Sequence, residues 1–332
     1  MNVRAIVLSV ALVLGLLAPP IMADAQQAGK IPTIGYLAQF SGPAGPPSAS
    51  IKAFLDGLQD LGYVDGKTIA IEYRYTEGKS DRLPDLAAEL ARLKVDVIVT
   101  ETGTAALHAK KATQTIPIVM QASADAVTQG LVASLERPGG NVTGLTALSP
   151  AVSGKRLQLL AEVVPKLTKV GVLWSGGPAA EPEWAETRSA AQPLKVQLHS
   201  LKVPAAADFP AAFAEAAQQD VQALLLFDVG GMLTTAVAAQ LADLAVKHHL
   251  PIMGWFPRFA DWGNLMGYGV NGLALCRRAA TYVDRILKGA NPAELPVEPP
   301  TKFELAINLK AAKAIDLTIP QSVLSQADRV IE

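Results

Sequence analysis

Two glycine-containing stretches are the parts of the sequence nearest to a phosphate-binding loop. Gly78-Lys79-Ser80 matches the end of such a loop, but the motif also needs a glycine where this chain has Tyr73. Gly139-Gly140 has neither the spacing of a dinucleotide-binding loop nor a following lysine. Without these glycines and the lysine, the backbone amides have no arrangement that wraps a phosphate. The sequence therefore favours no phosphate-binding loop.

Residues that bind metals or attack substrates are few and scattered. His108, His199, His248 and His249 form no His-Glu-x-x-His motif, and the single cysteine has no histidine near it in sequence. The adjacent His248 and His249 end an amphipathic helix, where the helix dipole favours positive charge. Cys276 lies in a helical pattern and is interpreted as a small core residue. Since a Gly-x-Ser-x-Gly motif is also missing, the sequence predicts no metal site, no cofactor and no catalytic site.

The composition and the N-terminus narrow the class of protein. The 332 residues carry a net charge of −1, which offers no electrostatic surface for nucleic acid or an anionic membrane. Arg4 precedes an apolar run from Ala5 to Leu17, and Ala23-Asp24-Ala25 has the small-x-small pattern of a cleavage site. A membrane anchor is the alternative, but the run is shorter than the about 20 residues that span a bilayer. We expect residues 1–25 to be a signal peptide cleaved after Ala25, and the mature chain to be free in the periplasm.

Strands and helices alternate along the chain in two successive sets. Short apolar strands are predicted at 31–37, 69–75, 95–100 and 116–120, and again at 169–174, 196–203, 221–227 and 250–253. Apolar residues recur at helical spacing between them, as at Leu83, Leu86 and Leu90. Lys169 to Trp174 echoes Thr33 to Ala38. This alternation predicts an α/β protein with two doubly wound parallel-sheet lobes joined by a hinge.

The repeated pattern also sets the expected domain boundaries. We expect residues 31–143 plus about 272–300 to form lobe 1, 144–271 to form lobe 2, and 301–332 to be a C-terminal segment packing near the hinge. The first lobe-to-lobe connection is expected at Asn141 to Leu148. There Gly139, Gly140 and Gly144 permit close backbone approach or the small dihedral changes of a hinge. Asn141-Val142-Thr143 is also formally a glycosylation sequon, a reading that the expected periplasmic location does not support.

Polar and aromatic residues follow the predicted strands at the edge where α/β proteins bind ligands. Ligands of open α/β sheets lie beyond the carboxyl ends of the strands, and two facing lobes would share one cleft. The candidate ligand-binding residues at these ends are Gln39, Phe40, Thr102, Gly103, Thr104, Ser123, Asp125, Ser175, Asp228, Trp255, Tyr268 and Asn271. The sequence therefore predicts a site for a small organic ligand between the lobes.

The residue types suggest a role for each part of this site. Thr102-Gly103-Thr104 opens a helix whose free N–H groups suit a carboxylate, and Asp228 suits a cation. Aromatic side chains at Phe40, Trp255, Phe256 and Tyr268 suit an apolar or aromatic body. The structural alternatives remain open: a helix cap at Thr102 or Thr104, a turn residue at Asp228, and ordinary packing for the aromatics. Glu101 would repel an anion unless it turns away or binds an amine.

From about Ile31 to the C-terminus, the chain resembles the substrate-binding proteins of ABC transporters, in the group of tryptophan and tyrosine importers. The resemblance rests on FLDGLQDLGYVDGKTIAIEYR (Phe54 to Arg74), VDVIVTETGTAAL (Val95 to Leu107), IPIVM (Ile116 to Met120), GLVASLERPGGNVTG (Gly130 to Gly144) and ILKGANPAELPVEPP (Ile286 to Pro300). It implies a type I periplasmic binding protein fold, in which two lobes joined by three strands close on a ligand. It also implies that Thr102-Gly103-Thr104 meets an amino-acid carboxylate and Asp228 its ammonium.

Two departures from the family pattern widen the range of expected ligands. Relatives commonly show Thr-Asp-Pro-Val where this chain has Ser123-Ala124-Asp125-Ala126-Val127. Some show Tyr-Gly-Ile-Asp where it has Tyr268-Gly269-Val270-Asn271, and Asn271 removes one countercharge. We therefore expect either an amino acid or a neutral or acidic aromatic compound.

The expected function is that of the periplasmic solute-binding component of an ABC importer. Its partners would be a small-molecule ligand and a permease with its ATPase, and the protein is expected to be a monomer that binds no nucleic acid. A periplasmic sensor subunit is one alternative, because a closed lobe pair can dock on a sensor domain. An enzyme is the other, with dispersed acid–base residues for which Glu101, Asp125 and Asp228 are the candidates.

Overall fold

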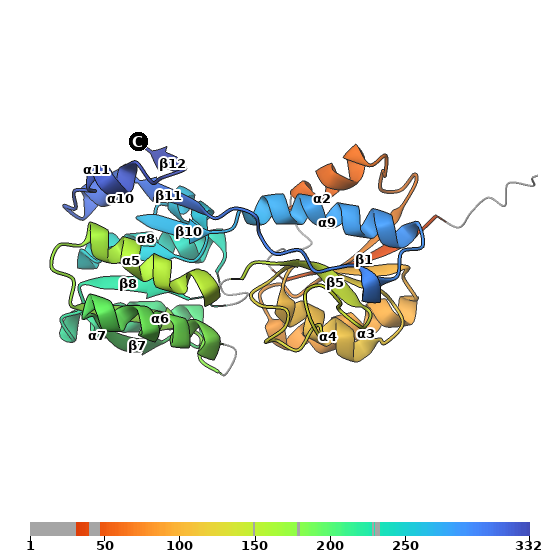
Figure 1. Ribbon diagram of the computed structural model, residues 1–332, viewed down its shortest axis with the longest axis horizontal. Coiled ribbons are helices and arrows are strands. Elements are labelled where there is room, and N and C mark those ends of the chain that lie inside the picture. The colour runs from red at the N-terminus through yellow and green to blue at the C-terminus, as the bar shows by residue number, and fades with distance from the viewer. Residues whose placement is uncertain (1–30, 40–46, 149, 178–179, 228, 230–232) are drawn as a thin grey trace, which may run out of the picture. The chain divides into compact units, whose positions relative to one another are not determined.

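The computed structural model describes residues 31–39, 47–148, 150–177, 180–227, 229 and 233–332. The predicted signal peptide and the candidate residues Phe40 and Asp228 lie outside these ranges. Among the helices within them, none has the length and apolar character needed to cross a membrane. The described part contains two α/β lobes, each built around its own sheet (Figure 1).

The first lobe has a five-stranded, all-parallel sheet in the order β2-β1-β3-β4-β5. Its strands are β1 (Thr33–Ala38), β2 (Ala70–Tyr75), β3 (Val97–Thr100), β4 (Ile118–Ser123) and β5 (Val142–Thr146). One face packs on α2 (Ala49–Asp60) and α9 (Gly272–Leu287), and the other on α3 (Leu83–Leu93) and α4 (Gly103–Ala112). β1 and β3 are buried between these helices, which explains their continuous apolar sequences.

The second lobe has a seven-stranded sheet in the order β12-β11-β10-β9-β8-β6-β7. Its first five strands along the chain are β6 (Lys169–Trp174), β7 (Gln197–Lys202), β8 (Ala223–Leu226), β9 (Ile252–Gly254) and β10 (Met266–Gly269). One face packs on α5 (Ser153–Val163) and α6 (Glu181–Leu194), and the other on α7 (Phe209–Gln218) and α8 (Thr235–His248). The loop after β9 contains the short helix η6 (Pro257–Trp262). As predicted, α8 ends at His248, with His249 in the left-handed conformation of its C-cap.

The two sheets repeat one strand order, which confirms the predicted duplication. The order β2-β1-β3-β4-β5 corresponds to β7-β6-β8-β9-β10. Gly35 and Gly171 are the third residues of the corresponding strands β1 and β6. A Cβ atom would lie 3.0 Å from a Leu90 side-chain carbon at Gly35 and 2.6 Å from one of Leu201 at Gly171. The echo between the two sequences therefore has a packing reason in both lobes.

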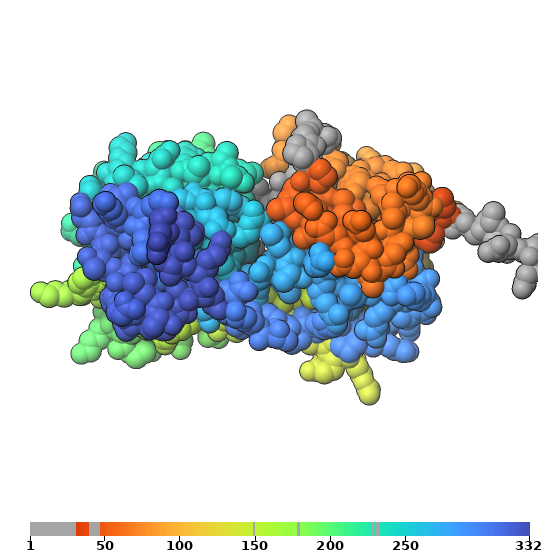
Figure 2. Space-filling model, turned by 90° about the horizontal axis from the view of Figure 1, so that it is seen from above, coloured from red at the N-terminus to blue at the C-terminus, as the bar shows by residue number. Residues whose placement is uncertain are grey.

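The C-terminal residues do not have the place expected for them. β11 (Glu304–Asn308) pairs antiparallel with β10 and parallel with β12 (Arg329–Ile331). Between them, α10 (Leu309–Ala314) and α11 (Gln321–Leu324) contribute to the same core as α5 and α6. Residues 301–332, dark blue in Figure 2, are thus an integral part of the second lobe rather than a separate segment near the hinge. Pairing with β11 satisfies the outer edge of β10, which would otherwise present free backbone groups.

The chain passes between the sheets three times, as the resemblance implied. Two passages come directly after β5 and after β10, and the third is the segment 295–303. The first and the third run side by side, because Leu145 and Glu298 form a parallel bridge. Glu298 N donates to Gly144 O at 3.0 Å, and Thr146 N donates to Glu298 O at 3.1 Å. The boundary expected at 143/144 falls inside β5, because this strand pairs with β4 through Thr146.

Glycine was expected at position 144 either for close backbone approach or for the dihedral changes of a hinge. Its φ is +126°, and a Cβ atom there would lie 2.3 Å from the carbonyl oxygen of Met120 on β4. Gly140 has no atom within 4 Å of its Cβ position. Close approach of two strands is therefore the reason for glycine at position 144.

Candidate functional site

The first sheet has its topological switch point between β1 and β3, and the predicted residues of this lobe gather there. The connection from β1 leads to β2 on one side, and the next strand, β3, pairs on the other side of β1. Gln39 follows β1, and Glu101 and Thr102 follow β3. Thr102 Oγ1 donates to Gln39 Oε1 at 2.5 Å, and Gln39 Nε2 donates to Ser80 Oγ at 3.4 Å. A polar network thus joins the two strand ends that open α/β folds use for ligands.

The Glu101 side chain belongs to the same polar network. The side chain is buried, at 5% exposure. Its Oε2 accepts the backbone N–H of Gln39 at 2.6 Å, and its Oε1 accepts the hydroxyl of Tyr36 at 3.3 Å. The pKa of the Tyr36 hydroxyl is raised well above its ordinary value, mainly by burial and secondly by the charge of Glu101. The hydroxyl therefore keeps its proton and stays a donor. Of the two alternatives left open for Glu101, turning away from an anion or binding an amine, these contacts favour the first.

Thr102, Gly103 and Thr104 lie at the start of α4, as the sequence predicted. Thr102 is the N-cap residue, and its Oγ1 accepts the N–H of Ala105 at 3.1 Å. Thr104 is exposed. Gly103 is crowded, because a Cβ atom there would lie 2.1 Å from Gln129 Oε1. The cap interpretation of Thr102 is therefore correct, and the same hydroxyl also belongs to the polar network.

Further polar atoms at the end of β4 have no hydrogen-bond partner among the described residues. They are Ser123 Oγ and Gln121 Nε2. Thr100 Oγ1 on β3 and Gln129 Oε1 also lack a hydrogen-bond partner. Gln121 Oε1 and Glu101 Oε1 lie 3.0 and 3.3 Å from the Tyr36 hydroxyl oxygen, and they share the single proton of that hydroxyl. Such buried groups are unusual in a finished core and are typical of a surface that is completed by a ligand or by water.

Asp125 has a local structural role. Its Oδ1 accepts the backbone N–H groups of Val127 at 3.0 Å and Thr128 at 3.1 Å, which forms an Asx turn after β4. Asn271 similarly caps α9, where its Oδ1 accepts the N–H of Ala274 at 3.2 Å. Ser175 is half-buried directly after β6. The structure thus gives two of these three residues a turn or cap function that the sequence analysis did not assign to them.

Trp255 and Tyr268 lie at neighbouring strand ends of the second lobe. Trp255 follows β9 and packs against Phe256 with a centroid distance of 4.4 Å, while its indole N–H has no partner in the described part of the chain. Tyr268 lies in β10 and its ring is 6.1 Å from that of Phe303. Burial is the main cause that raises the pKa of the Tyr268 hydroxyl. Both residues are half-buried.

The sequence analysis missed the buried arginine that joins these two strand ends. Arg156 of α5 is 1% exposed, and Nη1 lies 2.9 Å from Glu183 Oε1 on α6. Arg156 Nε donates to Tyr268 O at 2.8 Å, and Nη2 donates to Trp255 O at 3.1 Å. A signal was available: Val152, Arg156 and Leu160 are four residues apart, which places the arginine in the buried stripe of the helix.

Cys276 is a core residue, as predicted, and it lies near the first-lobe network. It is buried in α9. Burial, and secondarily the charge of Glu101, raise the pKa of the Cys276 thiol to about 12. The thiol is therefore protonated at neutral pH and is a poor nucleophile. In the part of the chain that the structure describes, no group of three or more His, Cys, Asp or Glu side chains has a geometry that suits a metal ion.

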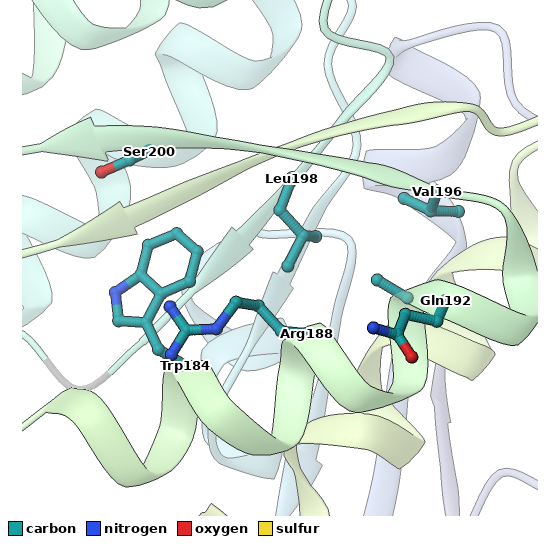
Figure 3. Close-up of a pocket in the computed structure, with 7 residues that line it drawn as sticks. Trp184, Arg188, Gln192, Val196, Leu198 and Ser200 are labelled. Atoms are coloured by element: carbon teal, nitrogen blue, oxygen red, sulfur yellow. The ribbon is translucent and has the colours of Figure 1, made fainter.

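An open pocket of about 450 Å³ lies elsewhere, along α6 and β7 of the second lobe (Figure 3). Trp184, Arg188 and Gln192 contribute from α6, and Leu198 and Ser200 from β7. The Arg188 guanidinium lies over the Trp184 ring, 5.9 Å from its centroid. None of the residues predicted from the sequence lines this pocket. The polar strand ends, rather than this surface pocket, match the chemistry expected of the site.

Comparison with known proteins identifies the family of the chain. A model of the ABC transporter substrate binding protein family matches residues 38–331. A tyrosine-binding protein of Clostridioides difficile is 27% identical over 277 residues, which cover 80% of this chain and 76% of that protein. A conserved domain protein from Vibrio cholerae has a crystal structure with a TM-score of 0.81 and 27% identity, covering 91% of this chain and 100% of that one. An ABC domain from Streptococcus, crystallised in complex with L-Trp, has a TM-score of 0.82 and 24% identity with the same coverage of both chains.

Proposed function

Because the chain belongs to the ABC transporter substrate-binding protein family, we propose that it captures an amino acid or an aromatic compound and delivers it to an importer. The family match over residues 38–331 carries the proposal. The tyrosine-binding relative and the tryptophan complex support an aromatic amino acid as the first ligand to test. The partners would be a permease and its ATPase, and the binding protein itself would act as a monomer.

The proposed ligand site combines the polar strand ends of the first lobe with the aromatic strand ends of the second. Thr102, Gly103 and Thr104 would bind a carboxylate through the N–H groups at the start of α4. The contacts of Glu101 support this assignment, because its charge is engaged by Gln39 N–H and the Tyr36 hydroxyl. The remaining proposed contacts are Gln39, Phe40, Ser123, Asp125, Ser175, Asp228, Trp255, Tyr268 and Asn271.

Asp228 is proposed as the partner of a ligand ammonium, and this assignment has a direct test. Asp228→Ala should weaken an amine-bearing ligand much more than its neutral analogue, because only the amine loses a charge partner. Isothermal calorimetry with the amine-bearing ligand and with its neutral analogue measures the loss of affinity for each. Equal losses would remove the ammonium assignment while leaving the binding function intact.

We place the mature protein in the periplasm, after cleavage of residues 1–25. The small-x-small pattern at Ala23 to Ala25 supports export, and substrate-binding proteins of this family act outside the cytoplasm. Cell fractionation and N-terminal sequencing of the mature protein test both statements. A mature protein that starts at Met1 and stays with the cytoplasmic fraction would contradict them.

The binding function is tested by a thermal-shift screen of amino acids and aromatic carboxylates, followed by calorimetry. A ligand that binds only the folded state raises the melting temperature. At a concentration one hundred times its Kd, it adds about 2.7 kcal/mol to the free energy of unfolding. Uptake of the identified ligand by cells with and without the gene then tests delivery. Binding without any uptake defect favours the sensor alternative, and turnover of the bound compound favours the enzyme alternative.

A further inference from the structure

We propose that Arg156 is a positioning residue that fixes the second-lobe half of the ligand site. The inference rests on the proposed function, in which Trp255 and Tyr268 contact the ligand. Arg156 does not need to touch the ligand itself. It holds the backbone on which both aromatic side chains are carried.

The pairing of β9 with β10 stops just before the two aromatic residues. The ladder between β9 and β10 consists of two pairs, Met253 with Met266 and Gly254 with Gly267. Trp255 and Tyr268 are the next residues on each strand, so their carbonyl groups lie just beyond the ladder. On its other side β10 stays paired, because Tyr268 and Gly269 pair with Leu305 and Glu304 of β11. The strand end at Trp255 has no further pair in the ladder with β10.

Arg156 supplies the missing connection. Its Nε–H donates to the carbonyl of Tyr268 at 2.8 Å, and its Nη2–H donates to the carbonyl of Trp255 at 3.1 Å. The guanidinium is planar, and its N–H groups have fixed directions. One rigid group therefore sets the spacing of two main chains, which a flexible lysine ammonium cannot do in the same way.

The guanidinium is itself held in place from α6. Glu183 Oε1 lies 2.9 Å from Nη1, and the Ser153 hydroxyl oxygen accepts from Nη1 at 3.3 Å. The arginine side chain is 1% exposed and that of Glu183 is 8% exposed. A buried pair of this kind is a poor source of stability compared with apolar packing, and specificity of arrangement is its best-attested use. Here the arrangement it specifies is that of the two carbonyls.

Glycine at position 269 gives independent support. A Cβ atom at Gly269 would lie 2.2 Å from the carbonyl oxygen of Trp255. The same carbonyl that Arg156 binds is thus packed directly against the β10 backbone. A side chain at 269 would push this carbonyl away while leaving the charge of Arg156 unchanged.

The main test uses Arg156→Lys, with Leu160→Ala as the matched control. Lysine keeps a positive charge for Glu183 but cannot bridge both carbonyls, whereas Leu160 is a fully buried residue one turn further along the same helix. Hydrogen–deuterium exchange is followed in the segments 254–257 and 266–270 and in the rest of the second lobe. We expect Arg156→Lys to speed exchange selectively in those two segments, and Leu160→Ala to speed it throughout the α5 and α6 layer. The same broad increase in both variants would overturn the proposal, because Arg156 would then be an ordinary core residue.

Gly269→Ala is the second variant, and it keeps the proposal testable if Arg156→Lys fails to fold. It should reproduce the selective faster exchange in 254–257 with Arg156 intact. Unchanged exchange there would contradict the proposed dependence of this strand end on close backbone contact.

Binding measurements separate this proposal from the proposed function. With L-tyrosine and L-tryptophan as probes, the wild-type protein should bind at least one, and Arg156→Lys should bind it about tenfold more weakly or worse. Wild-type protein that binds neither probe counts against an aromatic amino acid as ligand, while the exchange result still decides the role of Arg156. Selective exchange with unchanged affinity would overturn the functional part, because the positioned strand ends would then not serve the ligand.

Discussion

Arg278 and Glu298 form a two-point ion pair: Nε and Nη2 of the arginine lie 2.9 and 2.7 Å from the two carboxylate oxygens. Arg278 belongs to α9 of the first lobe, and Glu298 lies in a segment that leads into the second. The backbone of Glu298 also pairs with Gly144 and Thr146. Two passages of the chain are therefore fastened to each other and to α9.

This pair predicts a pH dependence of stability. The hydrogen bond from Arg278 is the main cause that lowers the pKa of Glu298 below its ordinary value of 4.5. A lowered pKa in the folded state stabilises the protein above the unfolded pKa, and this stabilisation is lost as the pH falls through the folded value. Glu298→Gln should cost up to about 1 kcal/mol at pH 7 and progressively less below about pH 4. Urea unfolding of the wild type and the variant between pH 3 and pH 7 measures the difference. Arg188→Ala, which breaks the ion pair with Glu181 on α6, is the control. A cost of Glu298→Gln that does not depend on pH would contradict the prediction.

Gly144 offers a sharper test of the backbone at the first passage. Gly144→Ala should cost about 1–3 kcal/mol or more, because alanine tolerates a positive φ poorly and its Cβ meets the Met120 carbonyl. Gly140→Ala is the matched control, since its Cβ position has no neighbour within 4 Å. The free energy of unfolding of both variants is compared by denaturant titration. Equal and small effects would restore the interpretation of Gly144 as a flexible hinge glycine.

Thr102 should contribute to both stability and binding. Thr102→Val removes the cap of α4 and the hydrogen bond to Gln39, and should cost about 1 kcal/mol of stability. It should also weaken a carboxylate ligand more than its amide analogue. Thr102→Ser retains the hydroxyl and should restore most of both properties, as measured by thermal unfolding and calorimetry. A serine variant as impaired as the valine variant would show that the methyl group, rather than the hydroxyl, is what matters.

Cys276 should be unreactive in the folded protein. Because burial raises the pKa of its thiol to about 12, very little thiolate exists between pH 7 and pH 9. Iodoacetamide should modify Cys276 rapidly in urea and very slowly without it, as followed by mass spectrometry. Rapid alkylation of the native protein at pH 8 would contradict both the burial and the raised pKa.

Much of the fold can be predicted from local patterns of apolar residues. The alternation of apolar strands and helices predicted two doubly wound α/β lobes, and the family resemblance implied the type I periplasmic binding protein fold. Both are confirmed. The predictions failed where long-range pairing decides the outcome. The stretch around Gly144 leads into the first passage between the sheets, but residues 142–146 also form β5, because β4 offers them a pairing partner. β11 was missed for the same reason, since only the exposed edge of β10 gives Glu304 to Asn308 a place.

The site was predictable as a set of strand ends but not as a network. Position after a strand is enough to select Gln39, Thr102 and Trp255 as candidates, and Tyr268 is the second-last residue of β10. The partners of buried charges are a property of packing, so the sequence left the role of Glu101 open and marked Arg156 only by its place in the apolar stripe of α5. A charged residue in the apolar stripe of a helix signals that a partner exists, and only the fold identifies it.

The order of segments along the chain has a consequence for how the protein is made. α9, which covers one face of the first sheet, comes from residues 272–287, and the second sheet is completed by β12 at residues 329–331. The first sheet therefore lacks one of its covering helices until residue 287 has been synthesised, and the second sheet lacks its last strand until residue 331. In the order of synthesis, the lobe that begins first is completed only after most strands of the other have been made.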